Sequence, residues 1–365
     1  MVLYQALKTA AEMSIALSGK ARQKGYSILH LVNRELKTRP DIPITQKLWA
    51  YRHGYVSSSV PLYGLRKDNR HEYLSQWQSE RARQINGDTA LVHENKLLFY
   101  YVLWPSFSDS LPALYGYLEN GRLHEIPFSS DSDNSLIDCV NRVGTVIVKP
   151  VDGTLGSGVS VIELTDGGFR INGTMKQAED LEHLSQRSDG CVVTEFVEQA
   201  GYAAKIFPES ANTIRIMTMV DPDTEKPFIG GLDHRFGTKE STPVDNTAQG
   251  GLSAGIDLET GRLGTAVAAP EDETLDRYNT HPETGAAIEG VNIPGWQRIC
   301  DRIIEMAAYL APLTPYIGWD VLVTDDEGSI VVLEANSYPD VPLQTHEPLL
   351  SNERVRRFYE YHDIV

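Results

Sequence analysis

The sequence predicts an α+β protein with a mainly helical N-terminal region, and three observations support this fold class. Apolar side chains recur at helical spacing within residues 1–40. From residue 112 onward, short β-branched segments alternate with glycine-containing turns, a pattern typical of hairpins. At 365 residues the chain is long enough to divide into two or three lobes.

Local signals along the chain predict the individual elements. The Asn120-Gly121 pair predicts a tight hairpin turn between two apolar segments. A helix is expected from Pro294, which suits a first helical turn, to Leu310, because apolar residues recur on one face. The other expected elements are helices at 70–86, from 94 onward and at 174–186, strands at 145–149, 159–164, 191–197, 213–220 and 228–234, and a hairpin at 317–335.

Composition excludes several classes of protein. Hydrophobic residues make up 41% and charged residues 23%, as in an ordinary globular protein, and the chain has no long apolar stretch. The first residues show no basic stretch before an apolar run, so we expect no secretory leader. Three widely spaced cysteines indicate buried thiols in a reducing compartment, so we expect a cytoplasmic protein with no membrane span. A net charge of −17 disfavours nucleic-acid binding.

The charge is uneven along the chain. Residues 1–95 carry 14 basic and 8 acidic side chains, so the remainder is strongly acidic. We expect the basic segment to dock on the acidic body or to lie near an anionic ligand, and a patch for a membrane surface or an acidic partner is the alternative.

A glycine-rich segment lies between the expected strands at 145–149 and 159–164. It follows Lys149 and contains Gly153, Thr154, Gly156, Ser157 and Gly158. Closely spaced glycines let several backbone N–H groups point at one anion, and the lysine adds a cation, so the segment is a candidate phosphate-binding loop. Its order differs from the Walker motif, in which the lysine follows the last glycine. The alternative is a flexible hairpin tip with a solvated lysine.

The last hairpin carries acidic residues at its open end. An Asp-Glu-Gly turn would pair Asp325 with Ser329 and, counting back, Asp320 with Glu334. Paired residues share a sheet face, and the two-residue period adds Asn336 to that face. Two adjoining carboxylates would repel each other, and a hard cation such as Mg²⁺ or Mn²⁺ relieves that repulsion. The alternative is two solvated acids at strand ends.

Another strand end has residues suited to a nucleoside. Glu195 and Glu198 flank Phe196 and Val197 at the end of an apolar strand. An apolar slot with a nearby acceptor suits adenine, and a carboxylate suits the ribose hydroxyls. Solvated surface acids have the same pattern.

Arg215 alternates with apolar residues on an expected strand, where its planar guanidinium would suit a phosphate or a developing oxyanion. An exposed strand arginine is the alternative. Two later polar segments are expected to face a substrate, and they contain Asp233, His234, Asn246, Gly250 and Gly251. His234 is a candidate general base, with a structural histidine as the alternative reading.

Together these motifs resemble those of the ATP-grasp superfamily, most closely its sugar-transfer-associated branch. The matching segments follow the family's order over residues 94–345, about two-thirds of the chain. They are 94–99, 146–158, 194–198, 212–215, 245–251, 318–320 and 334–336. The resemblance implies the ATP-grasp fold, two α+β lobes that grip ATP. We expect an accessory N-terminal region (1–93), an ATP-binding lobe (94–200) and a catalytic lobe (201–365).

The resemblance also implies roles for residues. Arg215 would neutralise the transferring phosphoryl group, with Lys149 beside it. The residues implied to bind ATP are Lys96, Lys149, the loop from Gly153 to Gly158, Glu195, Phe196, Val197 and Glu198. Those implied to hold one or two Mg²⁺ ions are Asp320, Glu334 and Asn336. The N-terminal region lacks the βαβ pattern of the family's usual first lobe, so the acceptor stays undetermined.

The activity expected from this resemblance is that of a carboxylate–amine ligase. ATP would phosphorylate a small-molecule carboxylate, and an amine would displace phosphate from the acyl phosphate. The alternatives are a kinase acting on a small-molecule or sugar hydroxyl, and a nucleotide-binding protein without turnover. The oligomeric state is open.

Overall fold

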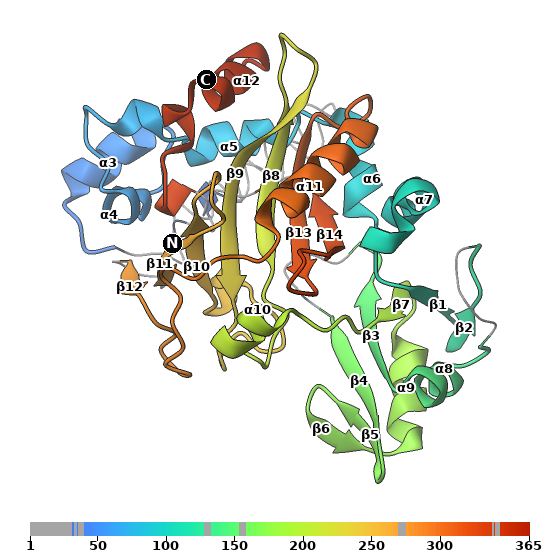
Figure 1. The fold of residues 1–365 in the computed structure, drawn as a ribbon. Helices are drawn as coiled ribbons and strands as arrows, with labels where there is room; N and C mark the ends of the chain where they lie inside the picture. The colour runs from blue at the N-terminus through green and yellow to red at the C-terminus, as the bar shows by residue number, and fades with distance from the viewer. Residues whose placement is uncertain are drawn as a thin grey trace.

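The computed structural model describes residues 31–32, 35, 40–127, 133–152, 158–268, 275–337, 339 and 344–365. Within these residues two seven-stranded antiparallel sheets, here sheets A and B, form separate lobes (Figure 1). The α+β prediction is therefore confirmed. The helix prediction for residues 1–40 lies almost wholly outside the described residues.

Sheet A has the strand order β2-β1-β7-β3-β4-β5-β6. Helices α8 (Leu136–Val143) and α9 (Ala178–Arg187) pack on it and share its apolar core. The predicted Asn120-Gly121 turn is confirmed, with both residues at positive φ. The strands are β1 (Leu114–Glu119), β2 (Arg122–His124), β3 (Thr145–Pro150), β4 (Ser160–Thr165), β5 (Gly168–Ile171), β6 (Thr174–Lys176) and β7 (Cys191–Glu195).

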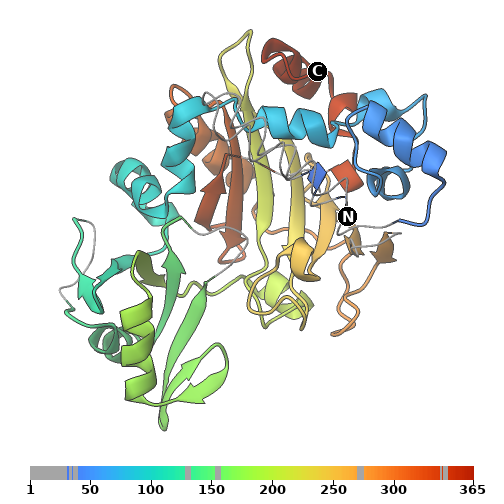
Figure 2. The ribbon, with the colours of Figure 1, turned by 180° about the vertical axis from the view of Figure 1, so that it is seen from behind.

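Sheet B has the order β12-β11-β10-β9-β8-β13-β14. Helix α11 (Trp296–Leu310) packs on one face, and α5 (Gln76–Ala82) and α12 (Glu353–Tyr361) pack on the other (Figures 1 and 2). The strands are β8 (Ile214–Val220), β9 (Pro227–Phe236), β10 (Leu252–Ile256), β11 (Leu263–Ala268), β12 (Asp276–Tyr278), β13 (Tyr316–Val323) and β14 (Ile330–Asn336).

Side chains alternate between the two faces of β8. Ile214 and Ile216 join the core beneath α11, whereas Met217 and Met219 join the core with α5 and α12. By the two-residue period of a strand, Arg215 shares the face of Met217. The polar residues described below lie on this face.

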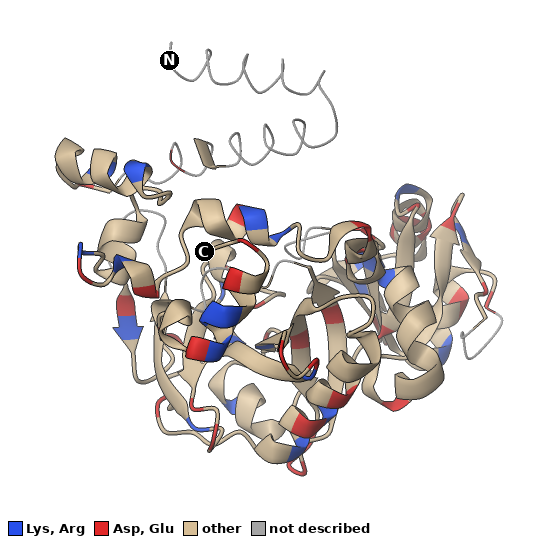
Figure 3. Ribbon diagram, turned by 90° about the horizontal axis from the view of Figure 1, so that it is seen from above, with Lys and Arg blue, Asp and Glu red and all other residues tan. Residues whose placement is uncertain are grey.

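Other helices link and flank the sheets. The asparagine before α7 accepts a hydrogen bond from Leu98 N at 2.9 Å and so begins the helix at its observed place. In the view of Figure 3, acidic and basic residues are interspersed along most described elements. The remaining elements are α3 (Ile44–Arg52), α4 (Ser59–Tyr63), α6 (Leu91–Glu94), α7 (Lys96–Phe107) and α10 (Gly201–Ile206), with 3-10 turns η1 (Arg70–Glu72), η2 (Gly87–Ala90), η3 (Ser108–Ser110), η4 (Thr247–Gln249) and η6 (Leu349–Ser351).

Three predicted helix extents are wrong. The helix expected at 70–86 is divided, because Ser75 forms a capping box with Gln78 and starts α5 afresh. Helix α9 begins four residues later than expected, since 174–176 instead pairs with β5 as strand β6. Pro294 lies before α11, whose N-cap is Gly295 at φ 59°.

Candidate functional site

A row of polar residues crosses sheet B from its β14 edge. Successive cross-strand partners are Glu334 (β14), Asp320 (β13), Arg215 (β8), Asp233 (β9) and Gly255 (β10). Directly paired residues share a face, so these side chains project on one side of the sheet. The row joins most of the charged residues that the sequence singled out in the second half of the chain.

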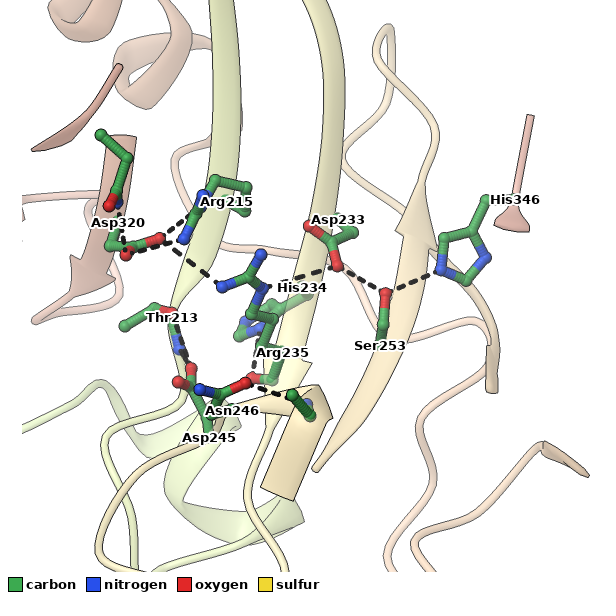
Figure 4. A network of polar contacts seen from close by, with 12 residues as sticks. Thr213, Arg215, Asp233, His234, Arg235, Asp245, Asn246, Ser253, Asp320 and His346 are labelled. Carbon is green, nitrogen blue, oxygen red and sulfur yellow. Dashed lines mark hydrogen bonds and ion pairs between the residues drawn. The ribbon is translucent and has the colours of Figure 1, made fainter. Parts of the chain in front are cut away.

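Asp320 and Arg215 form the centre of the row (Figure 4). Arg215 donates from Nε and Nη2 to the two Asp320 oxygens at 2.5 and 3.0 Å, and Arg235 Nη1 lies 3.9 Å from Asp320 Oδ1. Asn336 Nδ2 donates to Asp320 Oδ2 at 3.3 Å. Burial alone would raise the pKa of Asp320, but the two guanidinium groups outweigh it and lower that pKa below its usual value.

Glu334 has the opposite electrostatic balance. Its carboxylate lies beside Asp320 and 3.5 Å from Lys96 Nζ. Burial and the Asp320 charge raise the pKa of Glu334. The side chains of Asp320, Glu334 and Asn336 offer two carboxylates and an amide oxygen at one end of the sheet, which suits a hard divalent cation. Among the described residues no group of three His, Cys, Asp or Glu side chains has metal-binding geometry, so the amide would be needed.

A β-bulge at Leu333 sets the register of this end. The tip pairs Val323 with Ile330, and Thr324 N donates to Ser329 O at 2.9 Å, so the predicted pairing of Asp325 with Ser329 is wrong. The extra residue in β14 restores the predicted pairing of Asp320 with Glu334, which is confirmed.

The carbonyl of the bulge residue binds the other lobe. Lys149, at the end of β3, donates from Nζ to Leu333 O at 3.0 Å. Burial, with the nearby Lys96 charge, lowers the pKa of Lys149 to about 8. Two lysines of the first half of the chain, Lys96 and Lys149, thus meet the acidic end of sheet B.

The segment after β7 is partly engaged in backbone contacts. Glu195 Oε2 accepts a hydrogen bond from Ala113 N at 2.9 Å, which ties β7 to the segment before β1. Phe196 and Glu198 are exposed and Val197 is half-buried. The exposed aromatic ring of Phe196 leaves room for a planar ligand here.

Most of the glycine-rich segment lies outside the described residues, including Gly153, Thr154, Gly156 and Ser157. Gly158 is described, at φ 77°, and a Cβ there would lie 2.9 Å from Pro150 Cγ. Glycine is therefore required where the chain re-enters sheet A.

The structure separates Asp233 from His234. Asp233 lies in the polar row, but His234 projects to the opposite face, where Tyr202 Oη lies 2.8 Å from its Nε2 and Phe236 stacks on its ring at 4.3 Å. Burial lowers the pKa of His234 to about 3. The structural-histidine reading fits this environment, and the general-base reading does not.

The expected substrate-facing loop has local structural roles. Asn246 accepts a hydrogen bond from Ala248 N at 2.9 Å and starts a 3-10 turn. Gly250 has φ 94°, and a Cβ on Gly251 would lie 2.5 Å from Asp245 O, so both glycines are needed by the turn itself.

Two residues near the row, Ser253 and His346, escaped the sequence reasoning, because their contacts are non-local. Arg235 and Asp245 lie in the two polar segments expected to face a substrate, but neither was given a role of its own. Arg235 lies two residues after Asp233 on the same strand face, so its spacing was a usable signal. Asp245 Oδ2 accepts from Thr213 N and Oγ1, both at 2.6 Å. Ser253 Oγ donates to Asp233 Oδ2 at 2.5 Å and lies 2.9 Å from His346 Nε2 (Figure 4).

None of the helices in the described part of the chain is both long and apolar enough to cross a membrane.

Comparison with known proteins places the chain in a family. The model of a family described as sugar-transfer associated ATP-grasp matches residues 78–355. No curated protein matches.

Several solved structures are similar to this chain at low identity. An N5-carboxyaminoimidazole ribonucleotide synthetase in complex with ADP is 10% identical (TM-score 0.36), over 68% of this chain and 45% of that one. D-alanyl-alanine synthetase A from Vibrio cholerae is 12% identical (TM-score 0.42; 76% and 65%), and biotin carboxylase from Campylobacter jejuni is 11% identical (TM-score 0.40; 79% and 48%). The chain thus spans about half to two-thirds of the length of these proteins.

Proposed function

The chain belongs to the sugar-transfer-associated ATP-grasp family, and from that premise we propose that it is an ATP-dependent carboxylate–amine ligase acting through an acyl phosphate. The observation that carries the proposal is the polar row of sheet B, whose acidic end faces Lys149 of sheet A and Lys96 at the start of α7. Acids beside two lysines suit a ligand that joins a divalent cation to a polyphosphate.

The residues take complementary parts in this proposal. Lys96 and Lys149 bind the phosphates, and the exposed segment from Glu195 to Glu198 receives adenine and ribose. Asp320, Glu334 and Asn336 would hold Mg²⁺, which neutralises charge on the phosphoryl oxygens when bound. Arg215 and Arg235 present guanidinium groups to the carboxylate under attack and to the departing phosphate.

A trapping assay tests the proposal. The chain is incubated with Mg-ATP, hydroxylamine and separate pools of amino acids, hydroxy acids and sugar acids. Hydroxylamine captures an acyl phosphate as a hydroxamate, so one pool should yield hydroxamate, ADP and free phosphate in equal amounts. Asp320→Asn protein, prepared alongside, controls for contaminating enzymes. The absence of hydroxamate from every pool contradicts the proposal.

A kinase is the second candidate, favoured by one observation. Asp233, a buried carboxylate, lies one strand from Arg215, where it would accept the proton of an attacking hydroxyl. A kinase would release ADP with a sugar or other polyol, without free phosphate and without hydroxamate, so the same assay separates the two activities.

A further inference from the structure

The Asp233 carboxylate is only half satisfied. The residue is 0% exposed, and its Oδ2 accepts the Ser253 hydroxyl at 2.5 Å and lies 3.8 Å from Arg235 Nε. Its Oδ1 is buried and has no hydrogen-bond partner among the described residues. A buried carboxylate oxygen without a donor is unfavourable, so an N–H or O–H donor that reached this atom would be stabilised there.

The neighbours of Asp233 leave that oxygen for a ligand. Ser253 engages Oδ2 and is itself held by His346 Nε2 at 2.9 Å. His346 packs closely against β10 at Gly255, where a Cβ would lie 3.0 Å from the ring. Burial lowers the pKa of His346, which favours the neutral ring; the charged groups that act on it are Asp233 and Arg277.

The position of Asp233 in the row indicates which reactant it would bind. The acidic end at Glu334 and Asp320 comes first, the guanidinium groups follow, and Asp233 comes last. Arg235 lies between Asp320 and Asp233, 3.9 and 3.8 Å from their oxygens. Neighbouring strands are about 4.8 Å apart, so a group held at Asp233 lies one strand from the guanidinium groups. That place suits a third reactant, after the nucleotide and the carboxylate.

We propose that Asp233 binds the amine substrate, a primary amine that arrives protonated, and accepts its proton, with Ser253 and His346 as positioning residues. This inference rests on the proposed ligase activity. A proton passes from the ammonium nitrogen to Asp233, which frees the nitrogen lone pair. The neutral amine then forms the C–N bond at the acyl carbonyl, the C–O bond to phosphate breaks with its electron pair on phosphate, and phosphate takes the second N–H proton.

Two small nucleophiles test this role. Methylamine is almost wholly protonated at neutral pH, whereas hydroxylamine is almost wholly neutral, so only methylamine needs a base. With the carboxylate pool that supports hydroxamate formation, Asp233→Asn should lower methylamide formation by about 100-fold or more and leave hydroxamate formation within a few-fold of wild type. Raising the pH should restore the methylamine reaction of the variant as free amine accumulates.

Controls separate a chemical role from a structural one. Asp301→Asn, on the exposed face of α11, should behave as wild type with both nucleophiles. Ser253→Ala should weaken the methylamine reaction and Ser253→Thr, which keeps the hydroxyl, should restore it. If Asp233→Asn affects both nucleophiles equally, or neither, the amine site is refuted while the ligase stands. If wild-type protein forms no hydroxamate, the proposed function fails and this inference fails with it.

Discussion

At the scale of single residues, two neighbouring carboxylates show how local charge decides ionisation. Asp320 and Glu334 are cross-strand partners, yet the pKa of Asp320 is lowered and that of Glu334 is raised. Burial raises both, but Asp320 has the bidentate Arg215, whereas Glu334 has the weaker attraction of Lys96 and Lys149 and the repulsion of Asp320. Glu334 is therefore the carboxylate that gains most from a bound cation.

Asp245 gives a prediction about pH. Burial raises its pKa from 3.8 to about 6, against the charges and hydrogen bonds that lower it. The folded protein therefore binds the Asp245 proton more tightly than the unfolded chain does. Protonated Asp245 contributes its full share to the free energy of unfolding below the unfolded pKa, and this contribution is lost as pH rises through about 6.

The Asp245→Asn variant should lose this dependence. The free energy of unfolding of the variant minus that of wild type should increase as pH rises from 3.8 through about 6, because only wild type loses stability there, and should then stay constant. Urea unfolding of both proteins at a series of pH values measures the difference. A constant difference across that range would show that Asp245 does not titrate within it.

At the scale of elements, the β13–β14 hairpin shows how a bulge places a functional end. The observed turn places the pairing one residue away from the predicted register. The extra residue Leu333 in β14 compensates for this shift, so Asp320 and Glu334 are paired and share a face. The bulge also turns a backbone carbonyl toward Lys149 of the other sheet. One irregular residue therefore aligns the acids and supplies a contact between lobes.

The charges at the acidic end of this hairpin lead us to expect that Glu334→Gln keeps stability and loses ATP turnover. The substitution removes the repulsion with Asp320, so the free energy of unfolding should not fall, although a weak contact to Lys96 is lost. ATP turnover should fall by at least about 100-fold, since a ligand of the proposed cation loses its charge. Thermal unfolding and ADP release measure the two effects. Turnover close to wild type would remove Glu334 from the metal assignment.

At the scale of the whole molecule, two lysines contact the acidic end of sheet B where the two sheets approach each other. Lys149 of β3 reaches Leu333 O, and Lys96, which begins α7, reaches Glu334. Helix α7 itself packs with sheet B, where Phe99 lies against Trp319 of β13 with ring centroids 6.4 Å apart. Two of these contacts are made by lysines proposed to bind phosphate. A nucleotide bound by Lys149 would therefore compete with the hydrogen bond that joins sheet A to sheet B, and so would change the relative position of the two lobes.

This arrangement predicts that Lys149→Ala weakens nucleotide binding. Loss of one charge-assisted hydrogen bond should raise the Kd of a non-hydrolysable Mg-ATP analogue by about tenfold or more. Calorimetric titration measures this Kd. Lys149→Arg, which keeps the charge, should bind more tightly than the alanine variant, and Lys47→Ala on α3 should match wild type. Unchanged affinity in Lys149→Ala would make the lysine a purely structural contact.

The sequence by itself determined the features that depend on short-range rules. The Asn120-Gly121 turn, the hairpins of both sheets and the shared face of Glu334 and Asn336 follow from turn chemistry and the two-residue period of strands. The pairing of Asp320 with Glu334 was predicted from a turn register that is wrong, and it holds because of the bulge at Leu333. The sequence also predicted the family, because the family's motifs are short local segments that occur in the expected order along the chain.

Only the tertiary structure decided which polar groups come together. His234 and Asp233 are neighbours in sequence, but the strand sends them to opposite faces, so one is in the core and the other is in the row. Ser253 and His346 are 93 residues apart and meet because a loop returns over β10 at Gly255. Such contacts depend on how distant segments pack, and no local pattern of residues records them.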